Sequence, residues 1–372
     1  MERRLWSHTF GSSLYPNLFI FLVGTPGGGK TFPIKEAVRP LWKSVPDLFV
    51  SPTSMTSASL SDDLNAAKRR IVRPAAIPPY IEFNSLQIAL NELSIMFPAY
   101  DGELMNRFTD LYDCDVYEET RRAKSIKIVI PNSQVNLVAA TTPSYLNELM
   151  PPGAWDQGFI SRVIMVFSAE KIIKPLFTTK PKSTTLFKDL SDDLKVITDS
   201  FGQFRWEGPA ASAMENWARN GGPPTPDHPR LQHYVSRRNA HLLKLSMISA
   251  ISRADNGLVV TLDDFQNALN WLIEVEFYMP DIFKSMITGG DSAAMDEVYH
   301  FVHSTYMKDG QKPLPEHRVV RFISERVPAH SVMRVLETMY KSNMLEIQSH
   351  DAQGRNLWKP VARGYSGRGG AS

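Results

Sequence analysis

The chain has 372 residues, of which 43% are hydrophobic and 22% are charged. These proportions are close to those of ordinary globular proteins and exclude a largely disordered, fibrous or low-complexity chain. The length predicts two or three domains. Because 41 Lys and Arg side chains nearly balance 39 Asp and Glu, the net charge gives no argument for nucleic acid, and any basic surface must be local.

The single cysteine, Cys114, excludes an intramolecular disulfide and a cysteine-based zinc site. The first long apolar run, Leu18 to Val23, is far shorter than the roughly 20 residues that span a bilayer. It also leads into a glycine loop and not into a small-residue cleavage site, so it does not resemble a secretory signal. We therefore expect a cytoplasmic protein without a membrane anchor.

The first part of the chain has the pattern of an α/β domain. A continuous apolar run over Asn17–Val23 predicts a strand buried on both faces in a parallel sheet. A glycine loop and a short helix over Lys30–Val38 follow. The further elements expected in this part are a polar helix over 62–70, strands over 80–83 and 86–90, a helix over 103–112, a hairpin over 117–130, and strands over 135–140 and 162–167.

After a connector over 171–182, rich in Pro and Lys, the periodicity is helical. Helices are expected over 186–200, 210–220, 236–255 and 261–278, the last with a Thr261-Leu-Asp-Asp cap. A third unit has the order of a winged helix, with helices over 293–307, 316–326 and 330–341 and strands over 345–349 and 357–361. The predicted division is an α/β core at 1–175, a linker and helical lid at 176–290, a winged-helix domain at 291–363 and a flexible Gly-rich tail at 364–372.

The loop after the first strand carries the strongest motif of the sequence, G-x-x-x-x-G-K-[ST], between a predicted strand and a predicted helix. Its backbone N–H groups would hold the phosphates of ATP, Lys30 would neutralise them, and the Thr31 hydroxyl would bind Mg²⁺. The residues expected to bind nucleotide are Gly24, Thr25, Pro26, Gly27, Gly28, Gly29, Lys30 and Thr31.

Hydrolysis would also need a carboxylate at the end of a neighbouring strand, to hold the metal through water or to polarise the attacking water. Asn91 and Glu92 follow the strand predicted over 86–90, so Glu92 is the candidate for water activation and Asn91 for a metal contact. Glu82 and Asp101 are competing carboxylates. Asn91 stands where an Asp is usual, which leaves the metal geometry in question.

Two further segments could complete such a site. Thr142, after the strand over 135–140, could direct a hydroxyl at the γ-phosphate. Arg162 comes just before the last predicted strand, where an arginine can neutralise phosphoryl charge across a subunit boundary. A structural ion pair is the alternative for Arg162.

In this order the motifs resemble those of the AAA+ ATPases, in particular the minichromosome-maintenance helicases and related phage replication helicases, over nearly all of residues 17–359. The resemblance implies that 24–31 is a Walker A loop, Asn91-Glu92 a Walker B end, Thr142 sensor 1, Ser161-Arg162 an arginine finger, and Arg237 sensor 2. Lys30, Thr31 and Glu92 would act in cis, while Arg162 and Arg237 would reach a neighbouring subunit. The chain departs from the family at Asn91, Thr142 and Val163, and it has no room for the family's large N-terminal DNA-binding domain.

The resemblance also implies a hexamer-forming ATP hydrolase that translocates on single-stranded or forked DNA in phage or mobile-element replication, with other replication proteins as possible partners, in the cytoplasm of a bacterial host. The expected DNA contacts are four cations on the predicted hairpin, which suit non-specific phosphate tracking: Arg121, Arg122, Lys124 and Lys127. The alternative for these cations is a solvated hairpin edge. The winged helix could add His330, Arg334, Lys341, Arg355 and Lys359, with protein contact as the other option.

Two other functions stay open from the sequence. One is a replication initiator or helicase loader that binds ATP and assembles without processive movement, which the Asn91 substitution favours slightly. The other is a protein-remodelling AAA+ ATPase, against which the cationic hairpin speaks.

Overall fold

The computed structural model describes the whole chain except residues 10, 75–76, 122–125, 152–153, 156–157, 171–183, 254–256, 326, 328–330, 352 and 362–372. The predicted connector over 171–182 and the predicted tail over 364–372 therefore lie outside the described residues. The chain divides into two compact units, Met1–Phe283 and Lys284–Ser372. Among the described residues, no helix is both long and apolar enough to cross a membrane.

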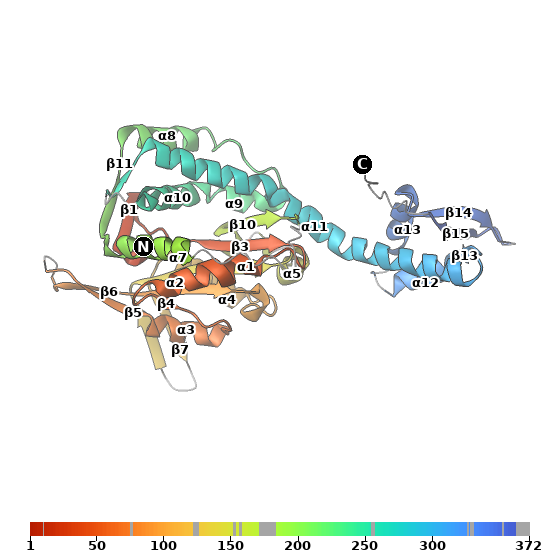
Figure 1. Cartoon of the computed structure of the whole chain (residues 1–372), viewed down its shortest axis with the longest axis horizontal. Coiled ribbons are helices and arrows are strands. Elements are labelled where there is room, and N and C mark those ends of the chain that lie inside the picture. The colour runs from red at the N-terminus through yellow and green to blue at the C-terminus, as the bar shows by residue number, and fades with distance from the viewer. Residues whose placement is uncertain are drawn as a thin grey trace. The chain divides into compact units, whose positions relative to one another are not determined.

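Five parallel strands form the centre of the first unit, in the spatial order β10–β3–β9–β6–β4. Figure 1 labels β10, β3, β6 and β4 of this sheet. This order places β9 between β3 and β6, so the carboxyl ends of these three strands are neighbours. A sixth strand, β5 (Lys68–Val72), pairs antiparallel with β6. The parallel strands are β3 (Phe19–Gly24), β4 (Phe49–Val50), β6 (Tyr80–Leu90), β9 (Ser133–Thr141) and β10 (Val163–Ser168).

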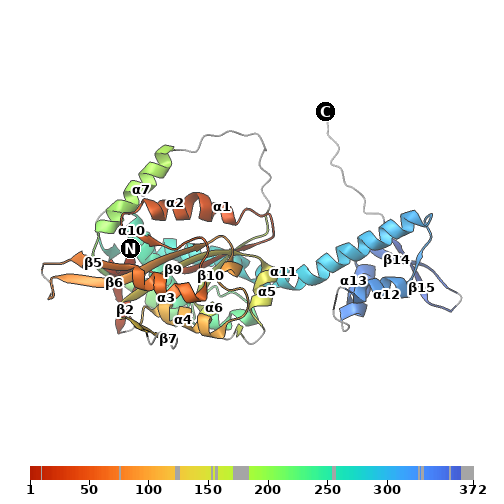
Figure 2. The same ribbon diagram turned by 90° about the horizontal axis from the view of Figure 1, so that it is seen from below.

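Helices cover both faces of this sheet because alternate strand residues point to opposite sides. Phe19 of β3 makes an edge contact with Phe108, on one face. Leu22 of the same strand packs with the cluster around Ile34, on the other face. Figure 2 shows the two layers, with α1, α2 and α7 on one side and α4 and α6 on the other. These helices are α1 (Thr31–Pro33), continued by a π-helical turn (Ile34–Val38) into α2 (Arg39–Ser44), then α4 (Gly102–Asp113), α6 (Gly158–Ser161) and α7 (Thr184–Asp199).

A second sheet in this unit, in the order β12–β11–β1–β2, was not predicted. The sequence pattern indicated only helices over 186–286, but β11 and β12 lie there. Both are short, and β11 pairs in parallel with β1, nearly 200 residues away in the chain. Such pairing has no local sequence signature. The strands are β1 (Leu5–Thr9), β2 (Ser12–Leu14), β11 (Gly202–Trp206) and β12 (Val259–Val260).

The helices beside this second sheet are held by a buried ion pair. Arg238 donates from Nε and Nη2 to the two carboxylate oxygens of Glu276, each at 2.7 Å, and both side chains are buried. The predicted Thr261 cap is confirmed, since Thr261 and Asp264 exchange backbone-to-side-chain hydrogen bonds. The helices are α8 (Gly208–Arg219), α9 (Gln232–Val235), α10 (Arg238–Ser252) and α11 (Leu262–Lys308).

Four predicted elements differ from the structure. The polar helix expected over 62–70 is α3, Ser57–Ala66, and the residues after it form β5. The strands expected over 80–83 and 86–90 are one strand, β6. The helix expected to end at Tyr278 continues through Pro280 as α11, because Met279, Ile282 and Phe283 are buried around the proline and the loss of one helical hydrogen bond is tolerated.

The second unit has its own core and its own antiparallel sheet, in the order β13–β15–β14. Val298 and Val302 of α11 pack there with Val335 of α13 and Trp358 of β15. The elements after α11 are β13 (Leu314–Pro315), α12 (Glu316–Ser324), α13 (Val332–Lys341), β14 (Leu345–His350) and β15 (Asn356–Pro360).

Several short elements complete the described chain. The hairpin predicted over 117–130 is present as an antiparallel pair of strands, β7 and β8. The remaining elements are β7 (Tyr117–Arg121), β8 (Ile126–Ile130), α5 (Pro143–Leu149) and the 3-10 turns Glu2–Arg4, Leu93–Ile95 and Pro229–Leu231.

Candidate nucleotide-binding site

The glycine loop follows directly from β3, the strand that lies between β10 and β9 in the parallel sheet. β3 ends at Gly24, where a Cβ atom would lie 2.7 Å from the backbone oxygen of Ser168 on the neighbouring strand. Only glycine therefore fits at this position. Gly27 and Gly29 have φ angles of +76° and +80°, in the left-handed region that side chains disfavour. The loop then enters the helix that begins at Thr31.

Lys30 lies across this loop. Its Nζ donates a hydrogen bond to the backbone oxygen of Thr25 at 2.8 Å. Burial lowers the pKa of Lys30 below its usual value, and the Glu92 carboxylate opposes this decrease. The predicted phosphate-binding cation is therefore electrostatically coupled to the predicted water-activating carboxylate, although 62 positions separate them in the sequence.

The carboxyl end of β6 carries the second motif. Asn91 and Glu92 follow its last residue, Leu90. Within the described part of the chain, Asn91 Oδ1 is buried and has no hydrogen-bond partner. The competing carboxylates have other roles: Glu82 forms ion pairs with two basic residues of β5, and Asp101 caps α4 by accepting a hydrogen bond from the Leu104 N–H at 3.0 Å. Glu92 is therefore the only one of the three that lines the cavity described below.

Thr141 is the last residue of β9 and Thr142 follows it, and the two threonines differ in their contacts. Thr142, the predicted residue, caps α5 by accepting a hydrogen bond from the Tyr145 N–H at 3.2 Å, and its hydroxyl also pairs with that of Ser144. Thr141 is buried, and its Oγ1 has no partner among the described residues. The sequence did not identify Thr141 as a site residue. The capping role of Thr142 does have a sequence signal, because a Thr before Pro is typical of an N-cap.

A cavity of about 590 Å³ joins these three segments at the carboxyl edge of the sheet. This volume is within the range of small-molecule sites in proteins. Tyr145, Leu93 and Ser94 also line it and had no motif that predicted them. The residues lining the cavity are Pro26, Gly27, Gly29, Lys30, Thr31, Asn91, Glu92, Leu93, Ser94, Ala140, Thr141, Thr142 and Tyr145.

The residues of this cavity fit a nucleotide with its metal better than a metal centre made of protein alone. Among the residues that the structure describes, no group of three or more His, Cys, Asp or Glu side chains could hold a metal ion. Mg²⁺ is usually bound through one or two protein oxygens together with substrate phosphates and waters. Thr31 and the unpartnered Asn91 Oδ1 supply oxygens of this kind within one cavity.

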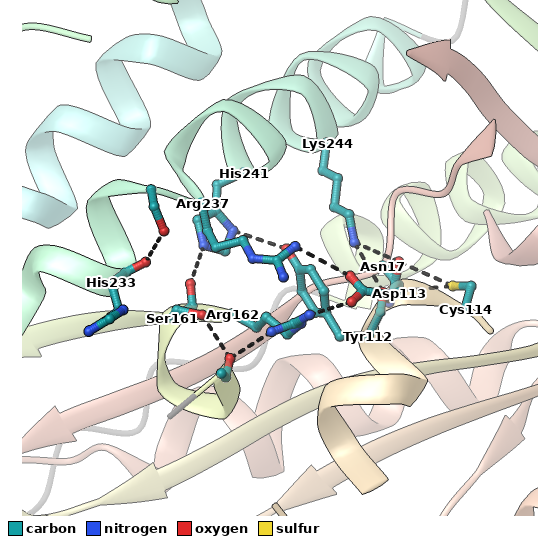
Figure 3. Close-up of polar contacts among 12 residues, drawn as sticks. Asn17, Tyr112, Asp113, Cys114, Ser161, Arg162, His233, Arg237, His241 and Lys244 are labelled. Carbon is teal, nitrogen blue, oxygen red and sulfur yellow. Dashed lines mark hydrogen bonds and ion pairs between the residues drawn. The ribbon is translucent and has the colours of Figure 1, made fainter. Parts of the chain in front are cut away.

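The two predicted trans-acting arginines do not line this cavity, but they lie together elsewhere (Figure 3). Arg162 is 5% exposed; it forms an ion pair with Asp113 and donates to the Gly158 backbone oxygen at 2.9 Å. Arg237 lies 3.7 Å from the same carboxylate and is more exposed. In the single chain, Arg162 thus has the structural ion pair that was the alternative to an arginine finger.

The predicted DNA-contacting hairpin is described only in part. Arg122 and Lys124 lie outside the described residues, and so does the side chain of Arg121. Lys127 is on β8, 3.7 Å from the carboxylate of Glu118 on β7. Lys127 of the hairpin therefore already lies opposite an acidic residue.

Most of the predicted cations of the second unit also have acidic partners. Lys341 pairs with Glu337, Arg355 with Asp351 and Lys359 with Glu346, at 2.7 to 2.9 Å. Arg334 donates to the Ser331 hydroxyl at 3.3 Å, and His330 lies outside the described residues.

No protein-family model matches the chain, and no curated protein matches its sequence.

Proposed function

We propose that this chain is a P-loop ATPase of the AAA+ type. The observation that carries the proposal is the single cavity in which the glycine loop, Asn91-Glu92 and the end of β9 meet. These segments are distant in sequence, and a P-loop ATPase needs all three kinds of group beside one triphosphate. The resemblance of the motif order supports the same conclusion.

In this proposal each part of the cavity has a role. The loop N–H groups and Lys30 bind the β- and γ-phosphates. The oxygens of Thr31 and Asn91 would hold Mg²⁺, which would supply positive charge beside the phosphates. Glu92 accepts a hydrogen bond from the attacking water and orients it. Thr141 lines the cavity and its Oγ1 has no partner among the described residues, so this hydroxyl, more than that of the capping Thr142, would bind the γ-phosphate or that water.

We further propose that ATP hydrolysis drives movement along DNA in a ring of identical subunits, six in number by the resemblance. The β7–β8 hairpin supports this proposal, because it precedes the strand that ends at Thr141 and carries the cationic sequence. Flexible cations on a hairpin suit backbone tracking without sequence readout. The three helices and three-stranded sheet of the second unit support the winged-helix assignment.

Specific observations favour two other functions. A neutral amide at Asn91 holds Mg²⁺ less tightly than a carboxylate does, which would suit a slow initiator or helicase loader. In the second unit, cations are paired with acids, and α13 exposes Met333 and Tyr340. This surface suits protein contact, as in a remodelling ATPase.

The first experiment measures ATP binding and hydrolysis by the wild type, Lys30→Ala and Lys43→Ala, with and without single-stranded and forked DNA. Lys43 is an exposed lysine of α2 outside the cavity and serves as the matched control. Loss of binding in Lys30→Ala alone would support the ATPase. Hydrolysis that DNA stimulates, together with displacement of a labelled strand, would support the motor. Hydrolysis that ignores DNA would favour the loader or remodelling function.

A further inference from the structure

Three charged side chains from distant parts of the chain meet at the end of α4. Asp113 is the last residue of that helix, Arg162 precedes β10, and Arg237 precedes α10. One carboxylate oxygen of Asp113 pairs with Arg162, and the other lies 3.7 Å from Arg237 Nη1 (Figure 3). A single carboxylate thus holds both guanidinium groups.

The position of Asp113 is unfavourable without these partners. A carboxylate at the last residue of a helix lies at the negative end of the helix dipole. The two arginines offset this arrangement, and they outnumber the carboxylate. Arg162 Nε is also buried without a hydrogen-bond partner in the described part of the chain. The cluster therefore has excess positive charge and an unused donor.

The two arginines differ in accessibility. The side chain of Arg162 is 6% exposed, and that of Arg237 is 38% exposed. Beside them is a second cavity, of about 510 Å³, which Asp113 and Arg237 line together with Lys244 and the hydroxyl-bearing Ser236. An anion that enters this cavity would meet Arg237 first, while Arg162 stays covered as long as Asp113 holds it.

We propose that Asp113 is a latch that keeps Arg162 and Arg237 bound within the free subunit and releases them to the phosphates of ATP held by an adjacent copy of this chain. This inference rests on the proposed function. Phosphate oxygens are stronger competitors for guanidinium groups than a single carboxylate, since they carry more charge and accept bidentate hydrogen bonds. This exchange of Asp113 for phosphate as the partner of the two arginines makes assembly of subunits dependent on bound triphosphate. Asp113 is a positioning residue in this scheme, because it acts through the arginines.

The latch itself is tested by modification of arginines with phenylglyoxal, without nucleotide, followed by peptide mass spectrometry. In the wild type, Arg237 reacts and Arg162 is protected. In Asp113→Asn, modification of Arg162 rises on the order of tenfold, which corresponds to the loss of one hydrogen bond to a charged group. Asp113→Glu keeps the charge and restores protection. Asp110→Asn, at an exposed carboxylate one turn earlier on α4 that does not line this cavity, leaves both arginines unchanged.

The exchange is tested by sedimentation velocity with a non-hydrolysable ATP analogue. Asp113→Asn lowers the protein concentration for half-assembly on the order of tenfold, by the same loss of one charged hydrogen bond, and Asp110→Asn does not. Lys30→Ala does not assemble, and free tripolyphosphate does not replace the analogue. If folded Asp113→Asn leaves Arg162 protected, or does not lower the assembly concentration, the latch is refuted.

Two further measurements keep the result decisive. Circular dichroism and thermal melting show whether Asp113→Asn folds. If Asp113→Asn does not fold, the assembly of Arg237→Gln is measured instead, because this change is at a partly exposed side chain. The proposal expects weaker assembly of Arg237→Gln, and unchanged assembly would overturn the proposal. Nucleotide binding is measured separately with Lys30→Ala. Absent Lys30-dependent binding refutes the ATPase proposal and this inference with it, whereas intact binding with unaltered assembly refutes the latch alone.

Discussion

Burial of Lys244 gives the stability of this protein a specific pH dependence. Lys244 is on α10, fully within the first unit, where its Nζ donates to Asn17 Oδ1 at 2.8 Å and lies 3.5 Å from the centre of the Tyr112 ring. Burial is the main cause that lowers the pKa of Lys244 from 10.5 to about 7. Among its neighbours, Cys114 and Asp113 raise this pKa, and Arg162 and Arg237 lower it.

The direction of the pH dependence follows from the protonation of Lys244 in the folded and unfolded states. Between pH 7 and pH 10.5 the unfolded chain binds a proton at Lys244 and the folded chain does not, so the free energy of unfolding rises with pH. The contribution of Lys244 to the free energy of unfolding is complete above pH 10.5. It decreases as the pH falls and is lost once the pH has fallen through 7. From pH 7 to pH 9 the gain is about 2 kcal/mol for this shift. Above pH 9 the buried Cys114 acts in the opposite direction, since its pKa is raised from 9.0 to about 11.

The assay is urea unfolding of the wild type and of Lys244→Met at pH 7 and pH 9. The wild type gains about 2 kcal/mol more than the variant over this range, because methionine has a similar length and does not titrate. Lys244→Met also loses the contact with Asn17, but this cost is present at both pH values. It therefore cancels when the change in unfolding free energy between pH 7 and pH 9 is compared. Parallel profiles for the two proteins would refute the reasoning and show that Asn17 and Tyr112 fully compensate the burial of the ammonium group.

Further predictions concern the cavity and the buried polar contacts. Thr141→Val lowers the rate of ATP hydrolysis and leaves the melting temperature unchanged, whereas Thr142→Ala removes a helix cap and costs about 1 kcal/mol in urea unfolding; the opposite pattern would reverse the two roles. Glu276→Gln breaks a buried ion pair and costs roughly 3–5 kcal/mol, while the exposed Glu274→Gln changes little in the same assay. His241 has its pKa lowered by burial from 6.5 to about 3, so the wild type loses about 2 kcal/mol more than His241→Asn between pH 6.5 and pH 4.5; equal losses would contradict this.

Much of the first unit was predictable because its signals are local. The buried strand before the glycine loop, the strands that became β9 and β10, and the helices α4, α8 and α10 follow from apolar periodicity within single segments. The Thr261 cap was predictable for the same reason, since both partners are three residues apart. The sheet formed by β1 and β11 was not, because each strand is short and its partner is remote in the chain.

The candidate site shows the same division. The glycine loop and Asn91-Glu92 were identified from residue types at fixed spacing after predicted strands. The choice between Thr141 and Thr142 could not be made in this way, because both are polar and adjacent. It depends on which hydroxyl is used by α5, and the structure shows that Thr142 caps that helix.

The sequence by itself determined which segments carry phosphate-binding chemistry and that an α/β domain would hold them, since both depend on local composition and spacing. Only the tertiary structure decided that β9 lies between β3 and β6, which brings these segments to one cavity. It alone also placed Arg162 and Arg237 on the carboxylate of Asp113. Strand order and long-range ion pairs depend on burial and charge summed over the whole fold, and no single segment encodes them.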